Sequence, residues 1–355
     1  MATPLRTVAL GLGLFAIQTA SAAVVTVTDC TVPPVEVHIG ATRISIGSDD
    51  LVLHCALVPL PGTDHLLLEA HDVTVEAPGS VSASGNFKTE IDAAGTITLK
   101  QTNVESTNQN GSLEMHAVGN VLIDQSSVSV GTPNQGGDVV RIDCSQAAPK
   151  CTITVSDSTI KARHLYMQSV GDQVFVKAKI LTNSPTDLVR LESSMGSILL
   201  GGTSQGGSGD CCGFGGGDGT SVVSGNEGNL YMAAFGRIDL SGANILVAEN
   251  ICGASGVPSN QVFGYDVCGT SCAGGSAASV PADIDLTDAS VRNDFAKKGS
   301  IRFCADETRA DVTIQGAVLI DDDTSAVNDL SLLNGCDTLP RSSCPHVVGV
   351  ADTDS

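Results

Sequence analysis

The chain of 355 residues contains no tryptophan, and it has only eight phenylalanines and three tyrosines. Sugar-binding clefts usually stack the sugar ring on an aromatic side chain, so this composition argues against a tight site for a neutral sugar. Positive charge is also scarce, because 18 Lys and Arg stand against 39 Asp and Glu, which gives a net charge of −21. Nucleic acids and anionic membranes attract basic surfaces, so we expect neither as a partner.

Beyond its N-terminal region the sequence has no apolar run long enough to cross a membrane as a helix. The N-terminal region has Arg6, a short apolar stretch over residues 8–17, and the small residues Ala20-Ser-Ala22. This order is typical of a cleaved signal peptide, and a buried N-terminal helix is the alternative. We therefore predict a signal peptide over residues 1–22, a mature chain beginning near Ala23, and a secreted protein without membrane insertion, whether periplasmic, extracellular or on the cell surface.

The twelve cysteines support export, since an even number in an exported chain indicates disulfides. Local loop closure favours three pairs, namely Cys144–Cys151, Cys336–Cys344 and Cys30–Cys55. The sequence leaves open the pairing of Cys211, Cys212, Cys252, Cys268, Cys272 and Cys304. Cys268 and Cys272 also have the spacing of half a zinc site, but no second close pair of ligands accompanies them, so we predict no metal site there.

The most informative feature is a repeated unit of eight residues, seen first in Ile97-Thr-Leu-Lys-Gln-Thr-Asn-Val104. Comparable units begin at Val121, Ile153, Ile238 and Ile284, and all five have apolar residues at the first, third and eighth places. Apolar residues two apart lie on one face of a strand, and the small or polar residues before the eighth place predict a corner.

A third apolar segment precedes several units, as in Leu113-Glu-Met115, Leu165-Tyr-Met167 and Leu230-Tyr-Met232. The units recur every 24 residues from Val73 to Ile97 and again to Val121, and the pattern predicts Val174 as the next start after Ile153. Three short strands per repeat predict an all-β, right-handed parallel β-solenoid of about nine coils with disulfide-linked insertions. An antiparallel sandwich or a propeller is the alternative, but neither explains a recurrence at about 24 residues.

The same spacing divides the chain into segments. We predict an N-terminal cap and first coil over residues 23–66, a β-helix over 67–328, and a C-terminal cap and tail over 329–355. The larger gaps between units predict insertions at 201–228 and 251–280, and ten of the nineteen residues in 201–219 are glycine.

Units such as Gly236-Arg-Ile-Asp-Leu-Ser-Gly-Ala-Asn-Ile245 resemble the repeats of filamentous-haemagglutinin-type adhesins, which form right-handed parallel β-helices on bacterial surfaces. The resemblance covers most of residues 73–320 and implies the coil rather than an activity. This chain is shorter and richer in cysteine than the large exported adhesins.

Parallel β-helices also include polysaccharide lyases and hydrolases, and each of these enzymes needs particular residues. A lyase that acts on uronic acids needs a basic side chain on an outward strand face. Five of the eighteen cations fall within thirty residues and make up our candidate site for an acidic polysaccharide: Lys161, Arg163, Lys177, Lys179 and Arg190. Solvated turn residues are the simpler interpretation of these cations.

No catalytic residues are predicted, because no aspartate recurs at one place in consecutive units and no nucleophile elbow is present. The seven histidines are scattered, which is typical of surface positions. Asp321–Asp323 and the group Asp283, Asp285 and Asp288 could contribute to a Ca²⁺ site, but neither has the spacing of a calcium loop. We therefore expect no cofactor, with Ca²⁺ as the open possibility.

Three functions remain open from the sequence. A non-catalytic structural or adhesive module, with a cell-surface component as its partner, explains the regular coil without a catalytic constellation. A lyase or binder of acidic polysaccharide explains the basic cluster. A subunit that self-associates end to end follows from the exposed edges of a solenoid.

Overall fold

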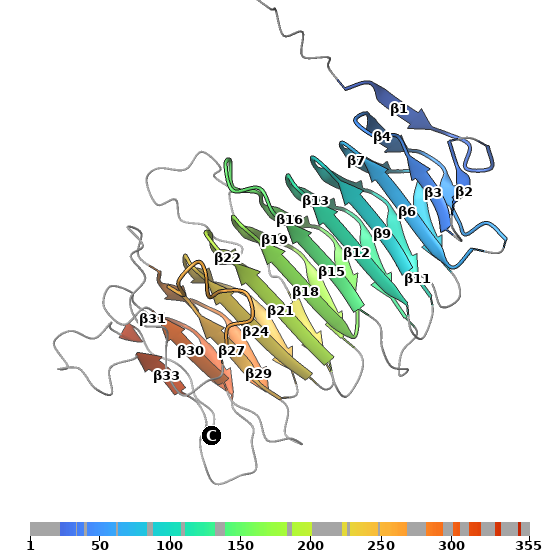
Figure 1. The fold of residues 1–355 in the computed structure, drawn as a ribbon. Coiled ribbons are helices and arrows are strands. Elements are labelled where there is room, and N and C mark those ends of the chain that lie inside the picture. Colours follow the sequence, from blue (N-terminus) through green and yellow to red (C-terminus); the bar gives the residue numbers. More distant parts are fainter. Residues whose placement is uncertain are drawn as a thin grey trace, which may run out of the picture.

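The structure is a computed structural model that describes residues 22–32, 34–38, 41–61, 63–83, 88–107, 111–131, 139–182, 187–200, 222–225, 228–247, 249–267, 282–293, 301–305, 312–320, 331–334 and 347–348. All regular elements in this part of the chain are β-strands, and they form three sheets that wind around one axis (Figure 1). Successive strands pass from sheet B to sheet A to sheet C, so three strands complete one turn.

Sheet A has twelve strands: β1 (Val24–Val27), β4 (Asp50–Leu53), β7 (Val73–Glu76), β10 (Ile97–Lys100), β13 (Val121–Asp124), β16 (Ile153–Ser156), β19 (Gln173–Val176), β22 (Ile198–Leu199), β25 (Ile238–Asp239), β28 (Ile284–Asp285), β31 (Val312–Thr313) and β34 (Val347–Val348). Sheet B also has twelve: β2 (Glu36–His38), β3 (Ala41–Ser45), β6 (His65–Ala70), β9 (Lys88–Ala93), β12 (Ser112–Ala117), β15 (Val139–Cys144), β18 (His164–Ser169), β21 (Asp187–Ser193), β24 (Gly228–Ala234), β27 (Ile251–Ala254), β30 (Ile301–Ala305) and β33 (Ser331–Asn334). Sheet C has ten: β5 (Ala56–Leu57), β8 (Ser80–Ala83), β11 (Asn103–Ser106), β14 (Ser127–Val130), β17 (Thr159–Lys161), β20 (Lys179–Thr182), β23 (Val222–Gly225), β26 (Asn244–Val247), β29 (Ser290–Asn293) and β32 (Val318–Ile320).

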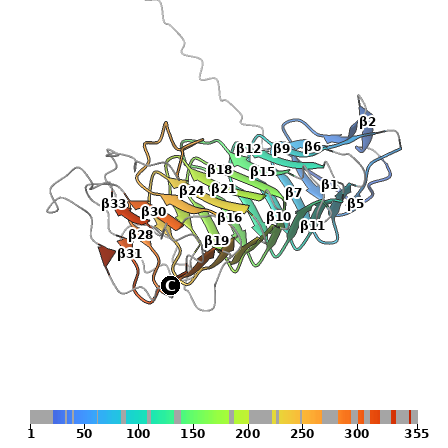
Figure 2. The same ribbon diagram turned by 90° about the horizontal axis from the view of Figure 1, so that it is seen from below.

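The fold is therefore a parallel β-solenoid, and the predicted count of about nine coils is confirmed. The first residues of the predicted repeats stack in register, as Ile97 pairs with Val121 and Val121 with Ile153. The segment Leu113–Met115 lies in sheet B, as predicted for the third strand of a turn. Figure 2 shows the three sheets from below, with the strands of successive turns side by side.

One strand is shifted from its predicted register. Gln173, not Val174, pairs with Ile153 and Ile198, so Gln173 points inward and Val174 outward. The shift lets the large side chain of Phe175 fill the core, where it is completely buried. The buried Gln173 amide is tolerated because its Nε2 donates to the carbonyls of Met167 (3.0 Å) and Glu192 (2.8 Å).

A single apolar core fills the solenoid from Val27 to Leu319. Most strands bury every second side chain, as the burial of Leu113, Met115 and Ala117 in β12 illustrates, whereas β27 buries all four of its residues. Parallel stacking of such strands removes a continuous inner surface from water, which is the main source of stability in a repeat protein.

In seven of the turns, the corner after the sheet A strand contains a residue in the left-handed backbone region. Five non-glycine residues occupy it at φ between 46° and 55°: Gln101, Gln125, Asp157, Lys177 and Asp288. Gly242 and Gly316 occupy the same corner in later turns with φ of 67° and 70°. The turn at the corner sets the backbone conformation of these residues, so their left-handed φ is explained without a bound ligand.

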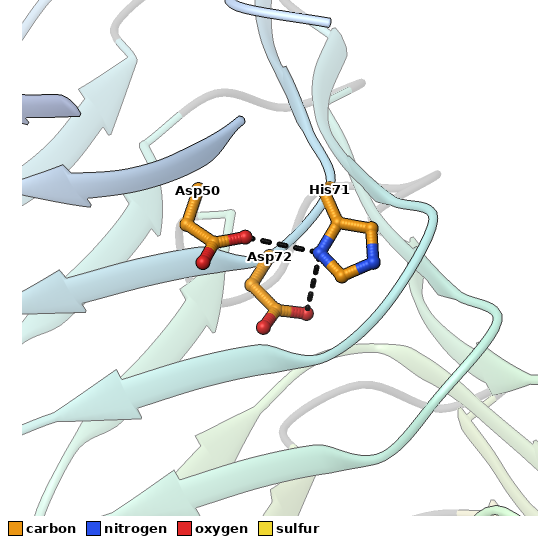
Figure 3. A group of neighbouring side chains, drawn as sticks. All are labelled: Asp50, His71 and Asp72. Atoms are coloured by element: carbon orange, nitrogen blue, oxygen red, sulfur yellow. Dashed lines mark hydrogen bonds and ion pairs between the residues drawn. The ribbon is translucent and has the colours of Figure 1, made fainter. Parts of the chain in front are cut away.

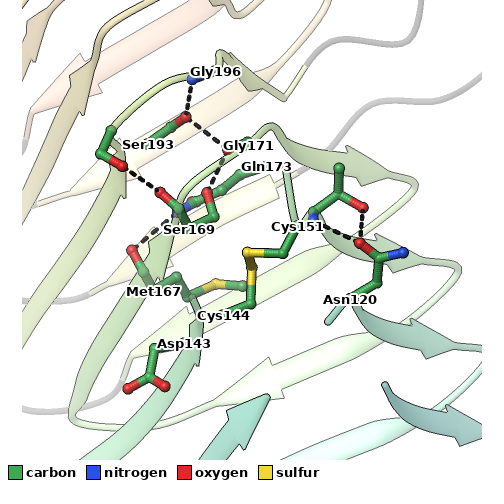
Figure 4. The surroundings of a disulfide bond; sticks show 12 residues. Asn120, Asp143, Cys144, Cys151, Met167, Ser169, Gly171, Gln173, Ser193 and Gly196 are labelled. Atoms are coloured by element: carbon green, nitrogen blue, oxygen red, sulfur yellow. Dashed lines mark hydrogen bonds between the residues drawn. A yellow bond between two sulfur atoms is a disulfide. The ribbon is translucent and has the colours of Figure 1, made fainter. Parts of the chain in front are cut away.

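Two of the predicted disulfides are confirmed, Cys30–Cys55 in the first coil and Cys144–Cys151 between β15 and β16 (Figure 4). Cys252 and Cys304 are disulfide-bonded as well. The remaining six cysteines, among them Cys336 and Cys344, lie outside the described residues. The disulfides indicate an oxidising compartment, as the cysteine count predicted.

The ends and insertions add detail to the predicted boundaries. The signal-peptide prediction concerns residues 1–22, of which only Ala22 is described. Strand β2 pairs antiparallel with β3 and thereby occupies the N-terminal edge of sheet B. Two solenoid strands lie inside ranges predicted as insertions, β23 within 201–228 and β27 within 251–280.

Candidate functional site

The outward face of sheet B carries two stacked columns of mostly polar side chains. Strand side chains alternate between the core and solvent, and parallel register places the outward residues of successive coils beside one another. One column contains Arg43, Leu67, Glu90, Glu114, Arg141, Tyr166, Arg190 and Tyr231. The other contains Ser45, Glu69, Asp92, His116, Asp143, Gln168 and Glu192.

A dense group of charges, here called the His116 cluster, lies over β9, β12 and β15 and consists of Glu90, Asp92, Glu114, His116 and Asp143. The imidazole Nδ1 of His116 is 2.9 Å from both carboxylate oxygens of Asp143, and its Nε2 is 3.2 Å from Glu114 Oε2. Lys88 Nζ lies 3.0 Å from carboxylate oxygens of both Glu90 and Glu114. The cluster thus gathers four carboxylates and one imidazole from three neighbouring coils.

The electrostatics of the cluster shift two of its pKa values upward. The hydrogen bond to Asp143 is the largest cause that raises the pKa of His116 to about 9, so the imidazole is protonated at neutral pH. Burial, followed by the charge of Glu90, raises the pKa of Asp92 above its usual range. Asp92 Oδ1 is completely buried and accepts no hydrogen bond. A buried carboxylate oxygen without a donor is costly, so this atom is the least satisfied of the cluster.

An open hollow of about 380 Å³ borders the cluster. Its lining includes Asp92, His116 and Asp143, together with Ser145 and the exposed Val118. The hollow leaves the Asp143 carboxylate open to a small ligand or solvent, whereas Asp92 Oδ1 lies covered beside it. Chemically, the arrangement can accept hydrogen bonds or coordinate a cation.

A second group of potential ligands lies at the corner between sheets B and A (Figure 3). His71 Nδ1 is 3.0 Å from Asp50 Oδ1 and 3.6 Å from Asp72 Oδ1. Asp72 Oδ1 already accepts a hydrogen bond of 2.6 Å from the backbone N–H of Thr96 in the next coil. Because Asp72 serves as a backbone cap and His71 is exposed, this group is explained by the structure of the corner.

The C-terminal part of the same face is covered. Residues 255–267 pack with the outward Ala233, Cys252 and Ala254 in a small apolar cluster. The segment is also bound to β21, because Gly264 N–H donates to Glu192 Oε1 (2.7 Å) and Arg190 Nη2 donates to the Tyr265 carbonyl (2.8 Å). The open part of the face therefore extends over β6 to β18 and ends at this segment.

All three tyrosines of the chain are found on or beside this face. Tyr166 and Tyr231 are outward residues of β18 and β24, and Tyr265 belongs to the covering segment. The guanidinium of Arg141 lies 5.9 Å from the ring centre of Tyr166, within the range of a cation–π contact. Tyrosine, which combines an aromatic ring with a hydrogen-bonding hydroxyl, is thus found where the outward columns are open or where they end.

The predicted basic site is divided between two faces. Lys161 and Lys179 lie on adjacent strands of sheet C, and Lys177 occupies the preceding corner. Arg163 lies at the corner that leads to sheet B. Arg190 is on sheet B, where its Nε donates to Glu192 at 2.5 Å. The structure thus places Lys161 and Lys179 on sheet C with Lys177 at the corner before it, but places Arg190 on a different face in an ion pair with Glu192.

The predicted acidic groups have structural partners where they are described. Asp285 accepts hydrogen bonds from the backbone N–H and the hydroxyl of Thr287, which forms a local turn. Asp288 occupies the left-handed corner, Asp283 directly precedes β28, and Asp321–Asp323 lie outside the described residues.

Sequence reasoning missed the His116 cluster because it compared aspartates at the first strand of each repeat. The usable signal lies in the third strand, where an acid or histidine follows the second buried residue: Leu68-Glu69, Ile91-Asp92, Met115-His116 and Ile142-Asp143. Alignment on the buried residue would have placed these side chains in one column.

The scan against protein-family models and the searches of curated proteins and solved structures find no match for this chain. The resemblance to filamentous-haemagglutinin-type repeats therefore extends to the parallel coil and no further. Among the described residues, no helix is long and apolar enough to span a membrane.

Proposed function

We propose that this protein is a non-catalytic extracellular β-solenoid that binds an extended carbohydrate chain along the open outward face of sheet B. The observation that carries the proposal is the set of varied polar side chains that line this face in register over five coils, up to the segment 255–267 that covers its end. Adhesion to a carbohydrate-bearing surface is the role that we propose for such binding.

The chemistry of the face suits sugar hydroxyls. The carboxylates of Glu69 and Asp143 accept hydrogen bonds, and the guanidinium of Arg141 and the amide of Gln168 donate them. The half-buried ring of Tyr166 supplies the flat apolar surface on which a sugar ring stacks. Because the groups repeat coil by coil, the face fits an extended polymer better than a single sugar.

The test uses purified oxidised protein and a panel of immobilised neutral, acidic and amino-sugar polysaccharides. The double variant Arg141→Ala/Tyr166→Ala removes both partners of the cation–π pair, so neither side chain remains without its partner. We expect it to weaken binding at least tenfold, which corresponds to about 1.4 kcal/mol. The matched control is Lys161→Ala/Lys179→Ala on sheet C, which should bind like the wild type.

Three results would contradict the proposal. Loss of binding only in the sheet C variant would favour the basic cluster and an acidic polysaccharide. Shortening of any polysaccharide during incubation would show an enzyme, because a binding module leaves chain length unchanged. Absence of binding across the whole panel would remove carbohydrate as the ligand.

A further inference from the structure

The His116 cluster contains the donor set of a metal centre. One ligand atom each from Glu90, Asp92 and His116 lies within 4.8 Å of the others. Two ligands of one ion at about 2.0–2.2 Å can be separated by at most about 4.4 Å, so small side-chain movements suffice to bring these atoms onto a metal. The three residues lie on the neighbouring strands β9 and β12, whose pairing fixes their spacing.

The second observation is the state of Asp92. Its Oδ1 is completely buried next to the hollow and lacks any hydrogen-bond donor, whereas Lys88 pairs with Glu90 and Glu114, and His116 pairs with Asp143. A buried acceptor without a donor is stabilised by a cation placed beside it. The hollow leaves space for the water molecules or ligand atoms that complete the coordination of such an ion.

The orientation of the imidazole is the third observation. Asp143 lies 2.9 Å from Nδ1 of His116, which leaves Nε2 on the side of β9 and β12, where it contacts Glu114 at 3.2 Å. A carboxylate that accepts a hydrogen bond from one imidazole nitrogen while the other nitrogen binds metal is the usual arrangement around metal-bound histidine. The ion displaces the proton that Nε2 shares with Glu114, and this proton passes to solvent while Nδ1–H stays on Asp143.

We propose that Glu90, Asp92 and His116 bind one divalent first-row transition metal ion, with Asp143 orienting the imidazole and Glu114 available as a fourth ligand. The imidazole donor selects Zn²⁺ or a similar ion over Ca²⁺, because Ca²⁺ takes oxygen ligands only. The site goes beyond carbohydrate binding and does not depend on it.

The experiment is isothermal titration of the untagged, oxidised protein with Zn²⁺ and, separately, with Ca²⁺. The wild type should take up one more Zn²⁺ than the isosteric variant Asp92→Asn or the variant His116→Ala, and neither variant should differ in Ca²⁺ uptake. His71→Ala removes the only histidine of the other candidate group and is the matched control, so it should keep the wild-type uptake. Cobalt substitution gives a second readout, since the visible spectrum of bound Co²⁺ should lose its nitrogen-ligand component in His116→Ala.

Circular dichroism establishes that each variant is folded before titration. Equal Zn²⁺ uptake by the wild type, Asp92→Asn and His116→Ala would overturn the proposal. Loss of uptake in His71→Ala alone would also overturn it, because the ion would then belong to the corner group of Figure 3.

Discussion

The corner between sheets B and A offers a sharp test of how closely the coils are packed. A Cβ atom added to Gly196 would lie 2.4 Å from the carbonyl carbon of Gly171 and 2.6 Å from the backbone nitrogen of Asp172 in the preceding coil. Ordinary carbon contacts are about 3.5–4.0 Å, so the overlap is roughly 1 Å, and both obstacles are backbone atoms. No rotamer change can relieve this clash, and the coils must separate locally.

Separation would weaken the bonds that hold this corner. Ser197 N–H donates to Asp172 Oδ1 at 2.7 Å, and Gly196 N–H donates to Ser193 Oγ at 3.1 Å. Overpacking typically costs about 1–3 kcal/mol, and a backbone clash without a flexible neighbour belongs at the upper end, so we expect Gly196→Ala to lose about 3 kcal/mol. The measurement is the free energy of unfolding in urea, followed by far-ultraviolet circular dichroism.

Gly242 is the matched control, because its backbone conformation, and not close packing, favours glycine there. Its φ is +67°, yet a Cβ at this position would meet no atom within 4 Å. Gly242→Ala should therefore cost only the strain of the left-handed region, about 1 kcal/mol. Gly242→Asn should cost less, since asparagine tolerates this region, whereas Gly196→Asn should cost at least as much as alanine. A loss below about 0.5 kcal/mol for Gly196→Ala, which is the size of an ordinary surface substitution, would refute the packing argument. A loss smaller than that of Gly242→Ala would refute it as well.

Two further predictions concern the His116 cluster and the core. Since its pKa is raised in the folded protein to about 9, the protonated His116 stabilises the fold fully below the unfolded pKa of about 6.5, and this stabilisation is lost as pH rises through about 9. After allowance for solvent screening at this partly exposed side chain, His116→Ala should cost about 1–2 kcal/mol at pH 6 and much less at pH 10, measured by urea unfolding with a chelator present. A difference from the wild type that stays constant over this pH range would contradict the assigned ion pair with Asp143. Phe175→Ala should cost about 3–5 kcal/mol because the ring is completely buried, while Phe263→Ala, at a ring that is 47% exposed, should change thermal stability little. Similar losses for the two phenylalanines would contradict the assigned register of β19.

The interior of the solenoid could be predicted from the sequence because it follows two simple periods. Alternation within a strand and recurrence after about 24 residues identify the inward column through Ile97, Val121 and Ile153, which the structure confirms. The same rule placed Val174 where Gln173 stands. It failed there because the volume of Phe175 and the backbone partners of Gln173 outweigh the preference for an apolar residue, and neither is visible in the pattern.

The exterior could not be predicted in the same way. Asp92 and His116 pair at the regular spacing of the repeat, but His116 and Asp143 are 27 residues apart, because the corner lengths differ between coils. The inward neighbours Met115 and Ile142 are also 27 residues apart, but their shared apolar character still marks them as equivalent, whereas the outward residues change type from coil to coil. Contacts such as that of Gly264 with Glu192, which join residues 72 apart, depend on a segment outside the repeat and have no signal in its period.

The segment 255–267 also affects how the solenoid unfolds. A solenoid in which each coil touches only its neighbours frays from its ends, one layer at a time. Here the bonds from Gly264 to Glu192 and from Arg190 to Tyr265 tie the segment that follows β27 back to β21, two turns earlier. Unravelling from the C-terminal side must release both bonds before β24 or β27 can detach alone. The turns from β21 to β27 therefore unfold together and resist proteases that attack frayed ends. Turns that lack such long-range hydrogen bonds open one at a time.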